Sequence, residues 1–246
     1  MSDHSERVKY LTRSEPKMRG PYQRPRDAAT LILLDYSGSE PKILLGKRHE
    51  GHVFMPGMFV FPGGRLDPED RRMKFCGALD PVSERRMLAR WSKPSKARIN
   101  ALALAAIRET SEETGILLGA NGEVPAAPSP GWQPFADAAL MPDLSALKFF
   151  ARAITPPGRK RRFDTRFFVA DRRAAKLERP GAAGPDSEFV ELRWMTCAEA
   201  RAGETPNITK VIIEEIELRL KAGFSDSIPA SFFYFKNGRF RREELI

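Results

Sequence analysis

The chain has 246 residues, of which 41% are hydrophobic and 30% are charged. That length and composition support one globular domain with a full hydrophobic core, so they exclude a chain that is disordered throughout. Lysine and arginine outnumber aspartate and glutamate by 41 to 32, and the resulting net charge of +9 attracts anions without naming one.

Apolar runs in the sequence are short. The longest, residues 28–34 and 54–61, fall far below the roughly 20 residues of a membrane-spanning helix, so no membrane span is predicted. The first residues alternate charge with polarity and lack the apolar core of a secretory signal, and we therefore expect a cytoplasmic protein. Cys76 and Cys197 are too far apart in the sequence for a cysteine-built zinc motif, and both are predicted to be free thiols.

The first part of the chain predicts an arm followed by a sheet. Residues 1–27 hold few large apolar groups and are predicted to lie over the surface of a single domain formed by residues 28–246. Three β-rich runs, bounded by breaks rich in glycine and serine, predict strands at residues 29–36, 41–48 and 57–64. The polar stretch 65–96 has the composition of an insertion, with a short helix expected near residues 82–91.

The strongest helix prediction covers residues 97–114, with Ser95 as the N-cap and Gly115 closing the C-terminal end. A long loop is predicted at residues 121–134, which contain four prolines and two glycines. Strand-like runs then follow at residues 147–154, 165–170 and 187–195, and a second helix at about 209–221. This order of strands, helix, strands and helix predicts an α/β or α+β domain with a mixed sheet covered by helices.

Three glutamates stand near the C-terminal end of the strongest predicted helix. Glu109, Glu112 and Glu113 occupy positions i, i+3 and i+4 and share one sector of the helix, while Leu104 and Ile107 face the opposite side. Like charges at this spacing cost about 0.2–0.5 kcal/mol per pair, so a counter-charge is expected. Clustered carboxylates suit a hard cation such as Mg²⁺; the alternative is an exposed acidic helix end paired with Arg108 or with lysines.

Upstream, the run Phe61-Pro62-Gly63-Gly64 ends a predicted strand in two glycines. Glycine lets the backbone turn sharply and approach a ligand closely, so a carbonyl at this corner can join a metal shell. A diglycine at a strand end is by itself an ordinary turn. Its pairing with an acidic helix is the informative feature.

This pairing resembles the box of the Nudix hydrolase family, G-x5-E-x7-R-E-U-x-E-E-x-G-U, in which U is a bulky apolar residue. Six fixed positions match within nine residues: Arg108, Glu109, Glu112, Glu113, Gly115 and Ile116. Gly64, followed by five residues and Asp70, matches the first half. Thr110 replaces the apolar residue, and the early glutamate is replaced by an aspartate or by a shifted acid, with Asp67, Glu69 and Asp70 as the candidates.

The box is also interrupted, because 37 residues separate Asp70 from Arg108 where the family pattern has 7. The extra residues form an insertion at about 71–100. A box split in this place resembles the subgroup of the peroxisomal coenzyme A diphosphatases, and residues 54–64 and 162–168 support the likeness. The coenzyme A signature upstream of the box is present in part: Leu44, Leu45, Arg48, Gly57 and residues 61–64 match, whereas Gly46, His49, Val53 and Phe59 depart from it.

The resemblance implies a Nudix-type α/β/α sandwich with a mixed central sheet and an insertion within the box. It further implies that Glu109, Glu112 and Glu113, with the carbonyl of Gly64, bind Mg²⁺ or Mn²⁺. Glu109 or Glu112 is expected to orient or deprotonate the attacking water, and Arg108 to orient a neighbouring acid. Contacts to the substrate are expected from Arg48, Phe61, Arg162, Asp164 and Arg166. Glu188 is either a further metal ligand or base, or an ordinary residue of a half-exposed strand.

The implied activity is metal-dependent hydrolysis of a diphosphate bond in a nucleoside-diphosphate-linked compound, with coenzyme A or acyl-coenzyme A as the leading substrate. One alternative is a pyrophosphatase for nucleoside triphosphates, dinucleotides or nucleotide sugars. Another is a noncatalytic module that binds a nucleotide or RNA, and the three intact glutamates argue against it. The basic runs lack interleaved aromatic residues, so we expect a small-molecule partner rather than nucleic acid or a membrane.

Overall fold

The computed structural model describes residues 4–15, 20–21, 23–51, 56–91, 93–122 and 129–246. Val53 and the start of the 54–64 stretch lie outside the described residues. The helices are α1 (His4–Ser14), α2 (Pro81–Leu88), α3 (Lys96–Thr114), α4 (Gln133–Asp137), α5 (Cys197–Ala202) and α6 (Asn207–Lys221). Short 3₁₀ turns are η1 (Glu69–Arg71), η2 (Pro130–Trp132), η3 (Leu144–Ala146) and η4 (Arg172–Ala174).

The strands are β1 (Arg26–Asp35), β2 (Lys42–Arg48), β3 (Phe59–Val60), β4 (Gly63–Arg65), β5 (Ile116–Asn121), β6 (Leu140–Pro142), β7 (Lys148–Ile154), β8 (Phe163–Asp171), β9 (Ala175–Glu178), β10 (Phe189–Thr196), β11 (Ala230–Lys236) and β12 (Arg239–Leu245). The main sheet has the order β10-β2-β1-β8-β7-β11-β12, with β3 beside β2 and β4 beside β1. Strand β1 pairs parallel with β8 but antiparallel with β2, so the sheet is mixed. A smaller antiparallel sheet has the order β6-β5-β9.

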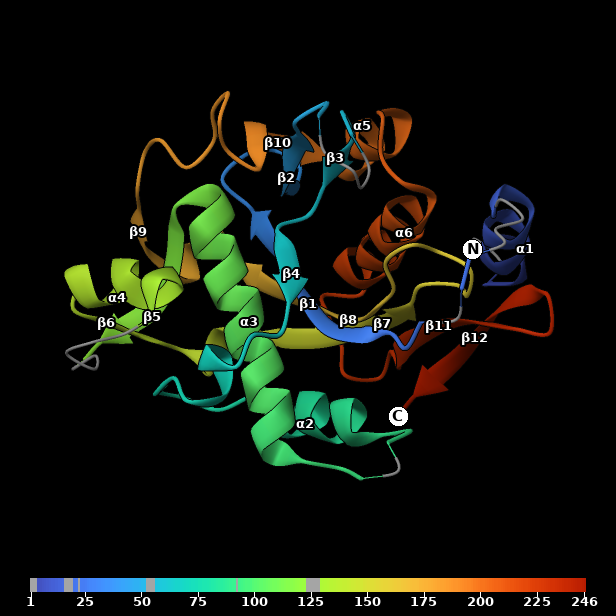
Figure 1. The fold of residues 1–246 in the computed structure, drawn as a ribbon, viewed down its shortest axis with the longest axis horizontal. Helices are drawn as coiled ribbons and strands as arrows, with labels where there is room; N and C mark the ends of the chain where they lie inside the picture. Colours follow the sequence, from blue (N-terminus) through green and yellow to red (C-terminus); the bar gives the residue numbers. More distant parts are fainter. Residues whose placement is uncertain (1–3, 16–19, 22, 52–55, 92, 123–128) are drawn as a thin grey trace.

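Helices cover both faces of the main sheet, which confirms the predicted sandwich (Figure 1). Along β1, Leu31 and Leu33 face one side and join the cluster that contains most of α3. Ile32 and Leu34 face the other side and join the cluster that contains α6. The strict alternation of a strand thus divides one continuous apolar run between two cores.

Helix α3 begins and ends where local chemistry predicts. The Ser95 hydroxyl accepts a hydrogen bond from the backbone N–H of Arg98 at 3.2 Å and caps the first turn. Gly115 adopts a left-handed φ of 74° at the other end, where a Cβ would overlap the carbonyl oxygen of Arg179. The helix is covered on more sides than its pattern indicates, because Glu113 on the expected acidic face is only 6% exposed.

The predicted insertion at about 71–100 forms a helix of its own and the start of α3. Its middle forms α2, which starts under the cap of Asp80, whose side chain accepts from the backbone N–H groups of Val82 and Ser83. Its last residues are the first turn of α3 rather than a separate loop. The match to the Nudix box therefore stops after η1 and resumes within the continuous helix α3.

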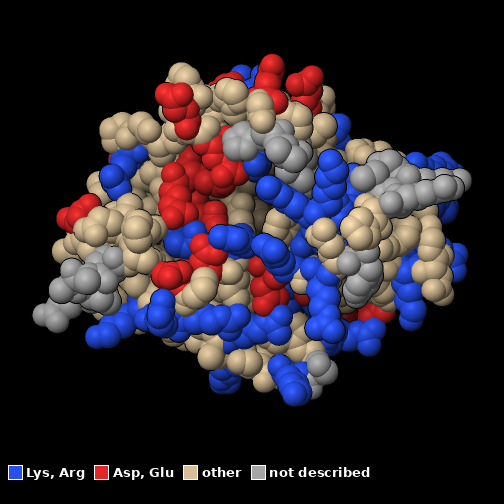
Figure 2. All heavy atoms as spheres, viewed as in Figure 1, with Lys and Arg blue, Asp and Glu red and all other residues tan. Residues whose placement is uncertain are grey.

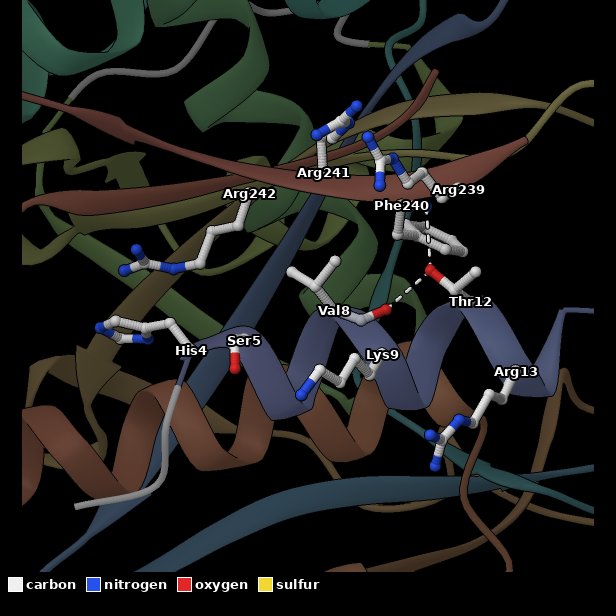
Figure 3. Close-up of a pocket in the computed structure, with 10 residues that line it drawn as sticks. All are labelled: His4, Ser5, Val8, Lys9, Thr12, Arg13, Arg239, Phe240, Arg241 and Arg242. Carbon is white, nitrogen blue, oxygen red and sulfur yellow. Dashed lines mark hydrogen bonds between the residues drawn. The ribbon is translucent and has the colours of Figure 1, made fainter. Parts of the chain in front are cut away.

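The N-terminal segment contains a packed helix, which its low apolar content does not reveal. Helix α1 lies between β12 and α6 (Figure 3). Arg7 is buried and forms ion pairs with Glu214 at 2.8 Å and Glu215 at 2.5 Å. The hydroxyl of Thr12 donates to the carbonyl of Val8 and accepts from the backbone N–H of Phe240. Polar contacts, as well as the buried Leu11, thus attach the predicted arm to the domain.

A groove of about 500 Å³ lies between α1 and β12. Its lining includes the basic residues His4, Lys9, Arg13, Arg239, Arg241 and Arg242. Arg239 and Arg241 point to the side of β12 away from α1, and Arg13 points away from the strand (Figure 3). These cations therefore diverge instead of converging on one point. Among the described residues, no helix combines the length and the hydropathy of a membrane-crossing segment.

Candidate active site

The three predicted glutamates lie on the last turns of α3, against the short strand β4. The backbone N–H of Gly63 donates to Glu113 Oε2 at 2.9 Å. The carboxylate of Glu109 lies against Gly64, where a Cβ would stand 2.5 Å from the carboxyl carbon. Residues that are about 45 positions apart in the sequence are therefore in direct contact, and only glycine fits at position 64. The structure thus brings together the diglycine corner and the acidic helix, as the motif predicts.

Arg108 is the centre of the site's hydrogen-bond network. Its Nη1 donates to Glu109 Oε1 at 3.0 Å and to Glu112 Oε2 at 2.7 Å. Its Nη2 donates to the backbone carbonyl of Arg65 at 3.1 Å, which ties the helix to the end of β4. The guanidinium is buried, so these bonds hold it and both carboxylates in one arrangement.

Asp70 completes the network from η1. It is fully buried and binds Arg108 at two points, with Nε to Oδ1 at 2.8 Å and Nη2 to Oδ2 at 3.0 Å. The other two candidates for the early acid contribute less, since Asp67 makes only a longer ion pair with the guanidinium, with Oδ2 at 3.9 Å, and Glu69 pairs with the exposed Arg72. Asp70 therefore makes the contact with the arginine, across the whole insertion.

Glu188 and Arg48 border the glutamates from the neighbouring strands. Arg48 ends β2, and Glu188 immediately precedes β10, which pairs with β2 so that Phe189 lies opposite Arg48. The two side chains form an ion pair, with Nη1 to Oε1 at 2.8 Å. Glu188 also raises the pKa of Glu113, and Arg48 lowers it, so both charges lie within electrostatic reach of the cluster.

The comparisons agree with this geometry. No family model matches the chain. A crystal structure of a Nudix hydrolase from Alicyclobacillus acidocaldarius superposes with a TM-score of 0.61 and 26% identity, covering 85% of this chain and 98% of that one. Two curated relatives carry the name acyl-coenzyme A diphosphatase NUDT19. The Xenopus laevis protein is 28% identical over 210 residues, and the human protein is 28% identical over 236 residues.

The chain has the Nudix fold and resembles Nudix hydrolases in sequence. The aligned region covers 66% of this chain and 54% of the Xenopus relative, and 76% of this chain and 59% of the human relative. The chain thus spans little more than half the length of the curated relatives that it matches. The Nudix fold explains why α3 and β4 meet, because the box supplies both elements.

Electrostatics in this Nudix box favour a bound cation. Burial raises the pKa of Glu109 to about 7, although Arg108 opposes the shift. Burial also raises the pKa of Glu112, and it raises the pKa of Glu113 well above the ordinary value, with Glu109 and Glu188 adding to the rise. Figure 2 shows acidic side chains gathered over the C-terminal end of α3, with lysine and arginine side chains beside them.

The donor set fits a hard divalent cation. Oxygen ligands from carboxylates and a backbone carbonyl are those that Mg²⁺ and Mn²⁺ prefer, and the close approach at Gly64 leaves its backbone beside Glu109. Within the described part of the chain, no three acidic, histidine or cysteine side chains form a ready-made metal cage. Glu109 and Glu112 are instead bound to Arg108, and Glu113 is bound to Gly63.

Four residues predicted to contact the substrate are placed elsewhere. Phe61 is 6% exposed and packs in the core beneath α6. Arg162 donates to the backbone carbonyls of Thr155 and Gln23. Arg166 and Asp164 are 1% and 9% exposed and form a 2.8 Å ion pair. Phe61, Asp164 and Arg166 are thus enclosed side chains, whereas Arg162 is half-buried, and contact of these residues with a substrate stays a prediction.

Asp164 and Arg166 belong to a structural network between the sheet and the insertion. Asp164 accepts two bonds from Arg152, at 2.8 and 2.7 Å. The guanidinium of Arg166 stacks 4.8 Å from the ring centre of Trp91, which also contacts Arg98. Arg48 is therefore the member of the predicted substrate set that lies beside the glutamates.

Gly131 in η2 also touches the site, although no sequence motif predicts a contact at this position. A Cβ at this position would overlap Glu112 Oε1 and lie 2.8 Å from Cδ of Arg108. The residue lies in the proline-rich loop that follows β5, where no motif distinguishes one glycine from another. Only the path of the chain through space reveals the contact.

Proposed function

We propose that this Nudix hydrolase cleaves a diphosphate bond in a nucleoside-diphosphate-linked compound and uses Mg²⁺ or Mn²⁺ to do so. The observation that carries the proposal is the contact between the diglycine corner and the glutamates of α3, with Arg108 binding Glu109, Glu112 and Asp70 at once. An acidic surface without function has no need of a buried arginine at its centre.

Glu109, Glu112 and Glu113, with the carbonyl of Gly64, would hold the metal ions. When bound, such ions neutralise the charge of a diphosphate and make a coordinated water more acidic. Arg108 holds the carboxylates of Glu109 and Glu112 in place, and Asp70 holds Arg108. Glu109 and Glu112 are both candidates to accept the proton of the attacking water, because both share Nη1 of Arg108 and neither is fully enclosed.

Arg48 is the residue that we assign to the diphosphate. Its guanidinium lowers the pKa of Glu113 and forms an ion pair with Glu188. It can therefore bind a phosphate group held at the glutamates. Glu188 then has a positioning role toward Arg48 and adds negative charge near the glutamates. A second base is the alternative role for Glu188.

Coenzyme A or acyl-coenzyme A is the substrate that we favour. Both named relatives are acyl-coenzyme A diphosphatases, and their likeness covers 66% and 76% of this chain. One departure from the coenzyme A signature has a structural reason: a Cβ at Gly46 would overlap the ring of Phe189, so only glycine fits at this position. The surface next to β2 therefore differs from that pattern, and substrate selectivity is the property to measure.

A substrate panel tests the proposal. Coenzyme A, an acyl-coenzyme A, a dinucleotide, a nucleotide sugar and a nucleoside triphosphate would each be incubated with the full chain and Mg²⁺ or Mn²⁺, and the products identified by mass. The expected result is two phosphomonoesters whose masses sum to the substrate plus one water, and no product in EDTA. E112Q should lose most of the turnover, and E40Q, at an exposed position outside the site, should keep it.

The panel separates the alternatives. Preference for a triphosphate, dinucleotide or nucleotide sugar would replace coenzyme A while keeping the hydrolase mechanism. Binding of a nucleotide without turnover under any metal condition would contradict the proposal and favour a noncatalytic module.

A further inference from the structure

The turn η2 lies directly on the acidic end of α3. Its middle residue, Gly131, is so close that a Cβ would overlap Glu112 Oε1, would lie 2.8 Å from Cδ of Arg108 and would lie 3.3 Å from its Cγ. Gly131 is not among the residues with positive φ, so alanine is allowed there by the backbone. The restriction at this position is therefore purely steric and concerns two side chains of the proposed catalytic network.

The turn is anchored and does not move away easily. Trp132 is 1% exposed, and its ring lies 5.2 Å from that of the fully buried Phe135. Its backbone N–H donates to the carbonyl of Ser129 at 2.9 Å, which closes the turn. Moving η2 outward would draw a tryptophan from the core that it shares with α3, at a cost comparable to burying a large aromatic side chain.

The other side of the contact is equally restrained. Arg108 is bound at two points by Asp70 and once by the carbonyl of Arg65, so its aliphatic stem has no freedom to move aside. Glu112 is held by Arg108 Nη1 at 2.7 Å and gives way only by breaking that bond. An added methyl group at position 131 would therefore displace the Glu112 carboxylate before anything else.

We propose that Gly131 is a positioning residue of the active site. The Trp132-anchored turn presses on Glu112 and on the stem of Arg108, and it sets where the Glu112 carboxylate stands relative to Glu109. The turn η2 thus borders the site at Glu112, and β4 borders it at Glu109. The inference deepens the proposed function, since it concerns a residue that acts through Glu112.

The test compares G131A with G38A. Gly38 is a matched control because a Cβ at that position would have the carbonyl oxygen of Glu40, at 3.8 Å, as its nearest neighbour. We expect G131A to bind Mn²⁺ at least tenfold more weakly by calorimetry and to lose at least tenfold in kcat at saturating substrate, with a smaller change in KM. G38A should stay within twofold of the unmodified chain in all three.

A rescue variant separates positioning from general damage. E112D shortens the side chain by one methylene and withdraws the carboxylate from position 131. The double variant G131A/E112D should therefore bind Mn²⁺ more tightly than the product of the two single affinity changes predicts. Its melting temperature should also be higher than the sum of the two single shifts predicts. If G131A does not fold, a folded G131A/E112D supports the contact, and failure of both variants to fold refutes a role specific to Glu112.

The outcomes distinguish this inference from the proposed function. If the unmodified chain binds no Mn²⁺ and hydrolyses nothing, the proposed function fails, while the thermal coupling between positions 131 and 112 still tests the contact. Equal behaviour of G131A and G38A in Mn²⁺ affinity, kcat and melting temperature would overturn the inference. An effect of G131A that is the same with and without E112D would overturn it as well.

Discussion

Arg108 and Asp70 form a buried ion pair at two points, although 38 positions separate them in the sequence. Asp70 comes from η1 and Arg108 from α3, and the insertion between them carries α2. The pair is the point at which the two halves of the split Nudix box are joined. The same guanidinium also binds Glu109 and Glu112, so the orientation of the proposed catalytic acids depends on it.

The first prediction concerns this pair. D70N removes one charge of a buried ion pair and should lower the free energy of unfolding by roughly 3 kcal/mol, because Arg108 keeps its charge without its two-point partner. Hydrolysis should fall more than tenfold, since Arg108 is then free to turn away from Glu109 and Glu112. Urea unfolding followed by circular dichroism measures the first effect. E69Q is the control, because Glu69 pairs with Arg72 at the surface and is expected to change stability by less than about 1 kcal/mol.

The second prediction concerns pH in the absence of metal. The pKa of Glu109 in the folded chain is about 7, against an ordinary value of 4.5. A raised pKa means that the folded state binds the proton more tightly, so this stabilisation is complete below about pH 4.5 and is lost as the pH rises to about 7. In EDTA, E109Q should therefore lose less stability than the unmodified chain over this interval.

Adding Mg²⁺ at pH 8 should stabilise the unmodified chain more than it stabilises E109Q. The metal would compensate the charge of Glu109 in the unmodified chain, and it would have less to bind in E109Q. Thermal unfolding at several pH values, with EDTA and with Mg²⁺, provides the comparison, and E40Q serves as the control. Identical pH profiles for E109Q and the unmodified chain would be evidence against the buried charge of Glu109.

The third prediction concerns Arg48. R48A should raise the KM for the best substrate of the panel by about tenfold and leave Mn²⁺ affinity within twofold, because the guanidinium is assigned to the substrate and not to the metal. K47A, which removes a cation from the preceding position of β2, is the matched control. An equal rise in KM for both variants would show that net charge near the site matters, rather than the arginine at position 48.

The fourth prediction concerns the attachment of α1. R7A removes a buried guanidinium that binds Glu214 and Glu215, of which Glu215 is fully buried. Loss of this partner should cost roughly 3 kcal/mol, while K9A, which breaks an exposed pair with Glu6, should cost less than about 1 kcal/mol. Chemical unfolding of both variants provides the measurement. A small effect of R7A would mean that Arg219 and Arg242 are sufficient to compensate Glu215.

Local sequence patterns were sufficient to predict those elements whose formation depends on residues a few positions away. The ends of α3 follow from Ser95 and Gly115, which satisfy backbone groups within one turn of the helix. The likeness of residues 108–116 to the Nudix box predicted the Nudix fold, which the structure confirms. The strands β1, β2, β7, β8 and β10 were visible as β-rich runs, whereas the hairpin of β11 and β12 was not recognised behind its charged residues.

Charged residues show where the sequence alone was insufficient. Arg48 and Arg166 have the same side chain and both lie near aromatic strands, yet one borders the glutamates and the other is 1% exposed in a network with Asp164. Arg48 pairs with Glu188, which is distant in the sequence, whereas Arg166 pairs with Asp164 only two positions away and is covered by Trp91 from the insertion. Residue type and spacing do not predict which of the two arginines the rest of the chain covers.

The sequence by itself determined the acidic helix, its caps and the diglycine corner, because helix ends and tight turns depend on hydrogen bonds between residues that are a few positions apart. Tertiary structure alone decided that Asp70, rather than Asp67 or Glu69, binds Arg108 at two points, and that Gly131 lies against Glu112. Those choices rest on side chains from separate elements that compete for one buried position, and only the packed chain brings them within reach of one another.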